Sequence, residues 1–292
     1  MRTKSTLCHL GSYLIAGCVL IGLARTATAA TVTLTDDNST AVIETELQAG
    51  VVDWSVDGAN QLQQLWYWYR VGGAGPESSI DTLVLDLAAT SDTNFDGDDE
   101  TLFVRYMDPG GAYMIEVVFQ LNGGAPGFGS SNFDELITIT NTGSTSIDFN
   151  FFEYANFDLA GSPNDDTVEM VGSNTVLQTD GTGSALTETV TAPAGNHNEV
   201  KIVPLTLDAL NDGSPTLLDD SAGPVGPADV SWAFQWSVPI GPGGSFQISK
   251  LKTIEVTAAC GNNVIDAGEE CDGADTGSCI GACVPAGDPN EC

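Results

Sequence analysis

From about residue 30 to residue 259, short apolar or alternating runs are separated by Gly, Asn, Asp and Pro. Among these runs are AVIETEL, LQQLWYWYRV, TLFVRYM, AYMIEVVFQL and VSWAFQWSVPI. Alternation with a period of two places successive side chains on opposite faces of a strand. Helical periodicity is almost absent. The pattern therefore predicts an all-β domain over residues 30–258, folded as an antiparallel β-sandwich or jelly-roll-like structure.

Local signals within this domain predict individual elements. TLFVRYMDPGGAYMIEVVFQL predicts a hairpin, because the residues 108–111 (DPGG) supply a turn between two strand-forming runs. LTLDALND, residues 205–212, has room for one or two helical turns. Two long polar stretches, residues 179–199 and 211–229, are expected to be surface loops.

The first 29 residues have the features of a secretory signal peptide. Arg2 and Lys4 precede an apolar run, and small residues close the segment at Ala29. An alternative is a lipoprotein signal, because IAGC, ending at Cys18, resembles a lipobox; the residues after it stay apolar. No second run of about 20 apolar residues occurs, so no transmembrane helix is expected in the mature chain. The leader predicts a secreted, extracellular or cell-surface protein.

The mature chain is strongly acidic. Five basic residues remain beyond the leader against 40 acidic ones, and five minus 40 gives a net charge of −35. Such a surface repels nucleic acid, which excludes nucleic-acid binding as a function. It is also compatible with Ca²⁺ as a cofactor, because carboxylates are preferred Ca²⁺ ligands.

The cysteines divide the chain in two. Two lie in the leader, and the other five lie in the last 33 residues, so residues 259–292 are expected to form a small module of their own. The spacing contains no C-x2-C pair, which favours disulfides over zinc in an exported chain. An odd count leaves one cysteine over, so Cys292 has an open role. The residues expected to form disulfides are Cys260, Cys271, Cys279 and Cys283.

LWYWYRV, residues 65–71, places four aromatic rings and an arginine in one strand. Alternation puts Trp66, Trp68 and Arg70 on one face and Tyr67 and Tyr69 on the other. Both faces are expected to be buried, because aromatic rings are common core material. The alternative is an exposed strip on which sugar rings stack, with Trp66, Trp68 and Arg70 as the ligand-binding residues.

DTNFDGDDE, residues 92–100, resembles the first half of an EF-hand loop. Its oxygen-bearing side chains alternate, and Gly97 allows a sharp turn. The glutamate expected at position 12 is replaced by Phe103. The loop predicts a Ca²⁺ site, and the pair Asp165-Asp166 is an alternative site. The residues expected to bind the ion are Asp92, Asn94, Asp96, Asp98 and Glu100.

Enzyme chemistry finds little support in the motifs. The mature chain has one histidine, His197, and it contains no G-x-S-x-G elbow, no phosphate-binding glycine loop and no histidine cluster for zinc. Two carboxylates suffice for glycoside hydrolysis, and the sequence offers too many to locate a pair.

Two stretches resemble known families. CGNNVIDAGEECD at the start of the tail resembles the cysteine-rich repeat of myxobacterial-type surface proteins. That family's repeat has no known catalysis and usually continues with a further cysteine. LQQLWYWYRVGGAGPESSIDTL, NFFEYANFDLAG and AFQWSVPIGPGGSFQISK resemble uncharacterised exported bacterial proteins that carry PEP-CTERM sorting tails. The resemblance implies export and gives no reaction.

Together these features predict a secreted, non-enzymatic protein of the cell surface or extracellular matrix, structural or adhesive and stabilised by Ca²⁺. Its partners would be extracellular polysaccharide or other surface proteins. Two alternatives remain: a lectin-like carbohydrate-binding module that uses the aromatic strand, and a polysaccharide-active enzyme.

The calcium hypothesis gives a first test. If residues 92–100 bind Ca²⁺, EDTA lowers the melting temperature of the domain, because a ligand of the folded state stabilises it. Asp96→Ala should remove the response. The same melting temperature with and without EDTA, in both proteins, would contradict the hypothesis.

Overall fold

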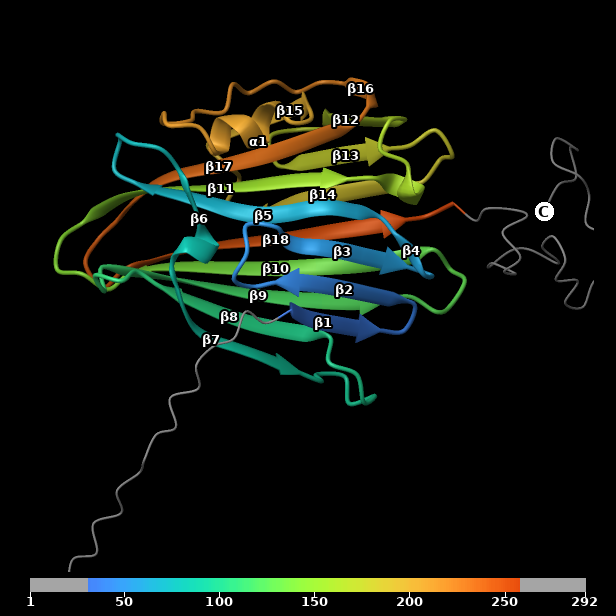
Figure 1. Ribbon diagram of the computed structural model, residues 1–292, viewed down its shortest axis with the longest axis horizontal. Coiled ribbons are helices and arrows are strands. Elements are labelled where there is room, and N and C mark those ends of the chain that lie inside the picture. The colour runs from blue at the N-terminus through green and yellow to red at the C-terminus, as the bar shows by residue number, and fades with distance from the viewer. Residues whose placement is uncertain (1–30, 258–292) are drawn as a thin grey trace, which may run out of the picture.

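A computed structural model describes residues 31–257 (Figure 1). The predicted signal peptide, the alternative lipid attachment at Cys18 and the cysteine-rich tail with its disulfides lie outside these residues. The described part is a sandwich of two nine-stranded sheets, as the alternation predicts. The prediction of an all-β sandwich is therefore confirmed for this part of the chain.

We call the first sheet sheet A. Its strands run in the order β1-β2-β3-β5-β11-β17-β15, with β4 paired to β3 and β6 to β5. All pairs are antiparallel except the short parallel contact between β3 and β5. The strands are β1 (Thr31–Asp36), β2 (Ser39–Glu44), β3 (Gly50–Val56), β4 (Ala59–Asn60), β5 (Leu62–Val71), β6 (Ser78–Ser79), β11 (Ile147–Phe157), β15 (His197–Ile202) and β17 (Val230–Ile240).

We call the second sheet sheet B. It is antiparallel throughout, in the order β16-β12-β13-β14-β18-β10-β9-β8-β7. Its strands are β7 (Val84–Ser91), β8 (Thr101–Met107), β9 (Tyr113–Gly123), β10 (Ser130–Asn141), β12 (Asp166–Met170), β13 (Thr175–Thr179), β14 (Ala185–Ala192), β16 (Val225–Ala228) and β18 (Ser245–Glu255).

Helices are short in the described residues. The α-helix α1 spans Leu205–Leu210, as expected for residues 205–212, and two 3-10 turns, η1 (Ile80–Thr82) and η2 (Leu159–Gly161), connect strands. No helix of the described residues is long and apolar enough to span a membrane.

The local predictions have mixed outcomes. The hairpin is confirmed, because β8 and β9 pair in register on either side of the turn at residues 108–111. The prediction of a surface loop over residues 179–199 is wrong, since these residues contain β14, which pairs with β13 and β18. The stretch ALTETVTA alternates like a strand, but a glutamate occupies one of its inward positions, and this polarity conceals the pattern.

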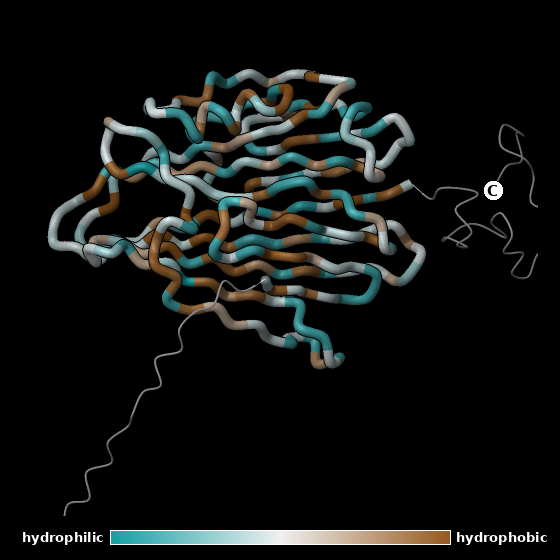
Figure 2. Tube along the Cα trace, in the orientation of Figure 1, coloured by the Kyte–Doolittle hydropathy of each residue, from teal (hydrophilic) through white to brown (hydrophobic). Residues whose placement is uncertain are grey.

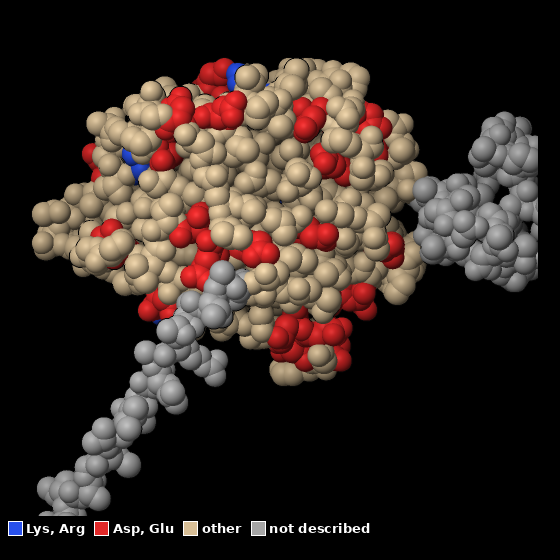
Figure 3. All heavy atoms as spheres, viewed as in Figure 1, with Lys and Arg blue, Asp and Glu red and all other residues tan. Residues whose placement is uncertain are grey.

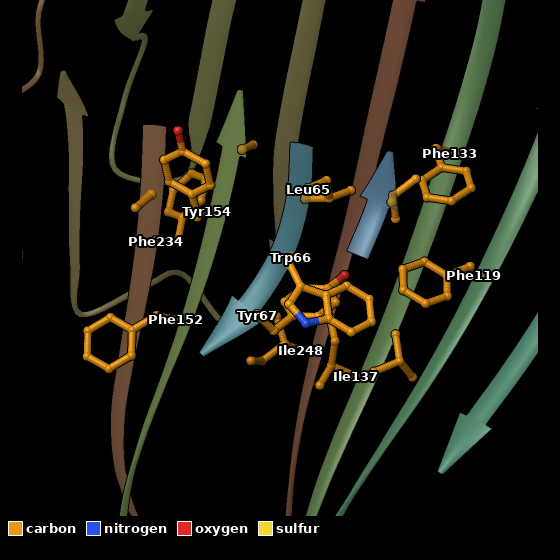
Figure 4. Close-up of a cluster of buried hydrophobic side chains, with 14 of the residues drawn as sticks. Leu65, Trp66, Tyr67, Phe119, Phe133, Ile137, Phe152, Tyr154, Phe234 and Ile248 are labelled. Carbon is orange, nitrogen blue, oxygen red and sulfur yellow. The ribbon is translucent and has the colours of Figure 1, made fainter. Parts of the chain in front are cut away.

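Apolar side chains fill the space between the sheets. Figure 2 shows the alternation of apolar and polar residues along the strands, and Figure 4 shows part of the resulting core. All five tryptophans are fully buried. Tyr67 stacks on Phe119 of sheet B and on Phe151 of its own sheet, so the inner face of β5 joins the two sheets.

A cluster of ionisable side chains is also buried in this core. Each of its charged side chains has no exposed surface, and they come from both sheets: Glu153 from β11 of sheet A, and Glu135, Glu188, Lys250 and Lys252 from sheet B. Lys250 Nζ lies 2.6 Å from Glu135, and Lys252 Nζ lies 2.7 Å from Glu153. We call these five residues the ion cluster.

Two neutral groups complete the hydrogen bonds of the ion cluster. The Tyr67 hydroxyl donates to Glu135, and the Trp232 indole N–H donates to Glu188 Oε2 over 2.6 Å. Burial raises the pKa of Tyr67 far above its usual value, and Glu135 raises it further, so the phenol remains a donor. Burial alone would lower the pKa of Lys252, but the surrounding glutamates raise it well above its usual value, so the ammonium stays charged.

The ion cluster needs one proton beyond those of its ammonium groups. Three carboxylates against two ammonium groups leave one negative charge. Burial and the neighbouring Glu188 raise the pKa of Glu153. Glu153 Oε2 has no hydrogen-bond partner in the core, and Glu188 Oε1 can accept a hydrogen bond beyond its contact with the Lys252 ammonium at 3.2 Å. A proton on Glu153 would supply that hydrogen bond and make the cluster neutral.

Replacing this carboxyl should therefore be well tolerated. Because its pKa is raised, Glu153 keeps a proton in the folded state that the unfolded state loses above about pH 4.3. The free energy of unfolding therefore falls as pH rises from about 4.3 to the higher pKa of the folded state. Glu153→Gln should remove that fall and leave the protein at least as stable at pH 7. Urea unfolding between pH 4 and pH 8 measures it.

Glu135→Gln is the matched control. It removes a carboxylate that contacts both lysines and Tyr67, so we expect a loss of about 3–5 kcal/mol at pH 7. Equal losses for the two variants would show that Glu153 is not the protonated carboxyl.

Candidate functional site

The residues singled out in the aromatic strand lie on the outer face of sheet A. Trp68 is directly opposite Phe152 of β11, and Arg70 is opposite Asn150, so these side chains share the face that points away from sheet B. Tyr67 points the other way, toward sheet B. The alternation therefore assigned the two sides of β5 correctly.

The outer face of sheet A lies beneath residues 203–224, which we call the cover segment. It contains α1, which packs against β15 and β17. Side chains of the sheet hold it by hydrogen bonds. The Trp68 indole N–H donates to Asn211 Oδ1 over 3.2 Å, and Gln235 Oε1 accepts from the Leu218 amide over 3.1 Å. Glu199 accepts from the Thr206 hydroxyl over 2.6 Å.

A buried ion pair fixes the middle of the cover segment. Arg70 pairs with Glu77, and the Glu77 side chain is fully buried. Glu77 also accepts from the Thr216 amide at 3.0 and 3.1 Å, and Arg70 donates to the Thr216 carbonyl over 3.2 Å. At the edge, His197 Nδ1 lies 3.0 Å from Asp220.

The alternative of an exposed stacking platform on β5 is therefore wrong. Trp66 and Trp68 have no exposed surface, and Arg70 is 9% exposed. Trp66 lies against the backbone of Gly50, where a Cβ atom would meet the ring at 2.3 Å, and donates to Asp81 over 3.1 Å. The sequence places these rings on one face but contains no signal that distant segments cover it.

The predicted Ca²⁺ loop joins β7 to β8. Figure 3 shows acidic side chains gathered where this loop protrudes at the lower edge of the molecule. Its carboxylates accept hydrogen bonds from its own backbone: Asp92 Oδ1 from the Phe95 amide over 2.5 Å, and Asp96 Oδ1 from the Asp98 amide over 3.0 Å. The hydrogen bond from the Asp98 amide, and then one from the Asn94 side chain, lower the pKa of Asp96.

Other predicted ligands in this loop also have partners. Asn94 donates to Asp36 and to Asp96, and Glu100 accepts from the Thr93 and Asn94 amides. Asp98 has an exposed side chain. Within residues 31–257, no three Asp, Glu, His or Cys side chains are grouped closely enough to hold a metal ion. The Ca²⁺ loop and the Asp165-Asp166 alternative stay predictions.

The outer face of sheet B carries polar and apolar side chains in rows across the strands. Phe103, Val118 and Leu136 lie directly opposite one another on β8, β9 and β10, which makes an apolar row. On one side of it runs the row Arg105, Glu116 and Thr138, and on the other the row Thr101, Gln120 and Asp134. The side chains of these rows are partly exposed. The helix α1 packs on sheet A and does not cover this face. We call these three rows the open face.

Charge on the open face is concentrated in two places. Arg105 Nε lies 2.8 Å from Glu116 Oε1, and its guanidinium lies over the Phe103 ring, 5.4 Å from the centroid. Across the apolar row, Asp134 accepts a hydrogen bond from Asn122 over 3.1 Å. Burial raises the pKa of Asp134, and the neighbouring Glu135 raises it further. A partly exposed carboxyl with a raised pKa is suited to donate or accept a proton.

Comparison with known proteins reveals similarity of fold. No family model and no curated protein matches the chain. A bacterial glucoamylase in complex with acarbose superposes with a TM-score of 0.51 at 6% identity, over 79% of this chain and 33% of the glucoamylase. This chain thus spans about a third of that enzyme.

Two further structures match over nearly their whole length. A putative aldose 1-epimerase from Escherichia coli K12 has a TM-score of 0.50 at 11% identity, over 78% of this chain and 99% of its own. The Slr1438 protein from Synechocystis sp. PCC 6803 has a TM-score of 0.51 at 8% identity, over 79% and 97%. At these identities the likeness concerns the fold.

These matches correct the function predicted from sequence. The described fold is shared with proteins named as an aldose epimerase and a glucoamylase, which are carbohydrate enzymes. The prediction of a non-enzymatic structural or adhesive protein of the cell surface or matrix is therefore wrong. No short motif in the sequence points to this fold, because strand order and register between distant segments define it.

The cover segment gives a test of its own. Glu77→Ala would leave Arg70 unpaired and remove both carboxylate acceptors of the Thr216 amide. We expect a loss of about 3–5 kcal/mol in urea unfolding and faster proteolysis of residues 211–224. Asp86→Ala is the control, because it removes a partly exposed partner of Arg105 and should change stability by about 0.5 kcal/mol or less. Similar effects of both changes would show that the Arg70–Glu77 pair does not hold the segment.

Proposed function

We propose that the protein is a carbohydrate-active enzyme that binds its substrate on the open face of sheet B. The observation that carries the proposal is the arrangement of the three rows. A sugar ring presents apolar C–H faces and a rim of hydroxyl groups. The open face presents an apolar row with hydrogen-bonding side chains on both sides, which is the complementary pattern.

The dimensions suit a substrate with more than one sugar ring. Adjacent strands are about 4.8 Å apart, so the apolar row from Phe103 to Leu136 extends about 10 Å across three strands. The apolar row continues on β7 with Ala89, opposite Phe103, and on β18 it meets the polar Ser249, opposite Leu136. An oligosaccharide or polysaccharide lying across the strands would contact the whole row.

Two groups have distinct roles in this proposal. Arg105 is already fixed by Glu116, so its remaining N–H groups and the carboxylate can hydrogen-bond sugar hydroxyls with little loss of side-chain entropy. Asp134 is the candidate acid–base group, because it borders the apolar row and its pKa is raised. Asp134 is opposite Gln120 of β9, and Glu116 lies four residues from Gln120 on the same strand. Asp134 and Glu116 are therefore separated by about 13 Å along the strand direction. That is wider than the carboxyl separation in glycoside hydrolases, about 5–9.5 Å.

The Asp134–Glu116 separation favours a reaction in which one protein carboxyl transfers protons at a single sugar. Mutarotation and epimerisation of an aldose are of this kind. The fold matches favour the same class. Because a signal peptide is predicted, we expect the protein to meet its substrate outside the cytoplasm.

Binding and turnover can be measured separately. A panel of soluble polysaccharides and free aldoses is titrated by calorimetry, and the same sugars are followed by polarimetry and by reducing-end release. Phe103→Ala should weaken binding by about tenfold or more, as expected for losing an aromatic contact worth about 1.5 kcal/mol. Phe128→Ala is the control, because Phe128 is 64% exposed and lies away from the three rows.

Asp134→Asn should bind as the wild type does but lose turnover. Because the raised pKa of Asp134 makes its charged form unfavourable, this variant should also be at least as stable as the wild type at pH 7. If the wild type binds no sugar, or if Phe103→Ala and Phe128→Ala behave alike, the open face is not the substrate site.

A further inference from the structure

A group of oxygen atoms lies on the outer face of sheet A, where β11 ends and β17 begins. Asn156 and Ser231 are directly opposite each other in the register of these strands, so their side chains share one face. Asp158 lies two residues after Asn156, and Asp229 lies two residues before Ser231. The two aspartates lie beyond the last paired residues of these strands, and Asp229 is close enough to Asp158 that its charge adds to burial in raising the pKa of Asp158.

These side chains have unused acceptor atoms. Asn156 Oδ1, Asp158 Oδ1 and Asp229 Oδ1 are buried without a hydrogen-bond partner, and Ser231 Oγ, which hydrogen-bonds Tyr154, lies beside them. Asn156 is 4% exposed, and Ser231 has no exposed surface. Buried polar atoms in folded proteins almost always have partners. Three such atoms at the adjoining ends of two neighbouring strands therefore indicate that something else contacts them.

The negative charge here has no counter-ion among the described residues. Burial raises the pKa of Asp158, and the neighbouring Asp229 raises it further. Burial also raises the pKa of Asp229, which Asn156 partly offsets. On the neighbouring strand β15, Lys201 is opposite Ser231, but its ammonium group pairs with Asp219.

Other acidic residues add to the negative charge at this end of the sandwich. Asp166 on β12 has no exposed surface, and Gln178 hydrogen-bonds its carboxyl. Burial, and then Asp165 and Asp158, raise the pKa of Asp166 to about 7. Asp208 of α1 is also close to this group, because its charge, after burial and the charges of Asp229 and Asp158, raises the pKa of Tyr154 on the same face. A cation would therefore be attracted to this end of the sandwich.

We propose that Asp158, Asp229, Asn156 and Ser231 form a Ca²⁺ site. All four donors are oxygens, which Ca²⁺ accepts in irregular arrangements of six to eight ligands. Zinc prefers nitrogen and sulfur, and Mg²⁺ requires a near-ideal octahedron. Two carboxylates balance the charge of one Ca²⁺ ion. Asp158 and Asp229 are half-buried, so water can supply the remaining ligands.

This site differs from the predicted loop at residues 92–100. The loop connects β7 to β8 at the edge of sheet B, and its carboxylates accept backbone hydrogen bonds. The site proposed here lies on sheet A, and Asn156, Asp158 and Asp229 each direct one unpartnered oxygen into it. Because it joins the end of β11 to the start of β17, bound Ca²⁺ would fix these two neighbouring strands of sheet A to each other.

The test uses the whole mature chain, in EDTA, in millimolar CaCl₂ and in millimolar MgCl₂. Ca²⁺ at a concentration well above its dissociation constant should raise the melting temperature by about 5 °C or more, and Mg²⁺ should have much less effect. Tb³⁺ in place of Ca²⁺ gives a direct readout, because Tyr154 on the same face can sensitise its luminescence.

Asp158→Asn with Asp229→Asn is the decisive variant. It should lose the response to Ca²⁺ and the Tb³⁺ signal, and its melting temperature in EDTA should be at or above that of the wild type, since charge repulsion is relieved. This last result distinguishes loss of a ligand from failure to fold. Glu255→Gln, which removes an exposed carboxylate elsewhere, should respond like the wild type.

Asp96→Ala separates the two sites. It should retain the response if the ion is bound at Asp158 and Asp229. The proposal is overturned if the wild type shows no Ca²⁺ response, or if the double variant keeps it in full. It is also overturned if lower pH stabilises the wild type while Ca²⁺ does not, because the two aspartates would then share a proton.

Discussion

The buried ion cluster is the constraint on which the sandwich depends. Charges without exposed surface are costly unless each is paired and hydrogen-bonded. Here the partners of the two β18 lysines come from β10, β14 and, across the interior, β11 of the other sheet. Shifting a strand by one residue would turn its charge outward and leave the others unpaired. The cluster therefore fixes both the register within sheet B and the position of sheet A above it.

The two outer faces then differ for a simple reason. On sheet A, the Arg70–Glu77 ion pair also bonds to the Thr216 backbone and so holds the cover segment in place, and the aromatic residues beneath it act as a second core. On sheet B, the Arg105–Glu116 pair is satisfied within the sheet and needs no covering segment. The open face of sheet B is therefore available for a ligand, and no sequence motif predicted a site among its residues.

The acidity of the chain also has more than one role. The loop at residues 92–100 turns its carboxylates toward its own amides, which stabilises a protruding turn. Asp158 and Asp229 lie close together, and each has one unpartnered oxygen, an arrangement that favours a cation. Both are carboxylate-rich segments, and what distinguishes them is whether the backbone supplies hydrogen-bond donors.

Alternation alone determined the sandwich, the β8–β9 hairpin and the sides of β5, because these follow from neighbouring residues and a period of two. It failed at residues 179–199, where the inward Glu188 made a central strand resemble a loop. The burial of Trp68 and the rows of the open face depend on register between strands far apart in sequence. So do the pairing of Glu153 with Lys252 and the meeting of Asp158 with Asp229. Only the tertiary structure decides these, because hydrogen bonding between strands sets which side chains become neighbours, and no local pattern encodes it.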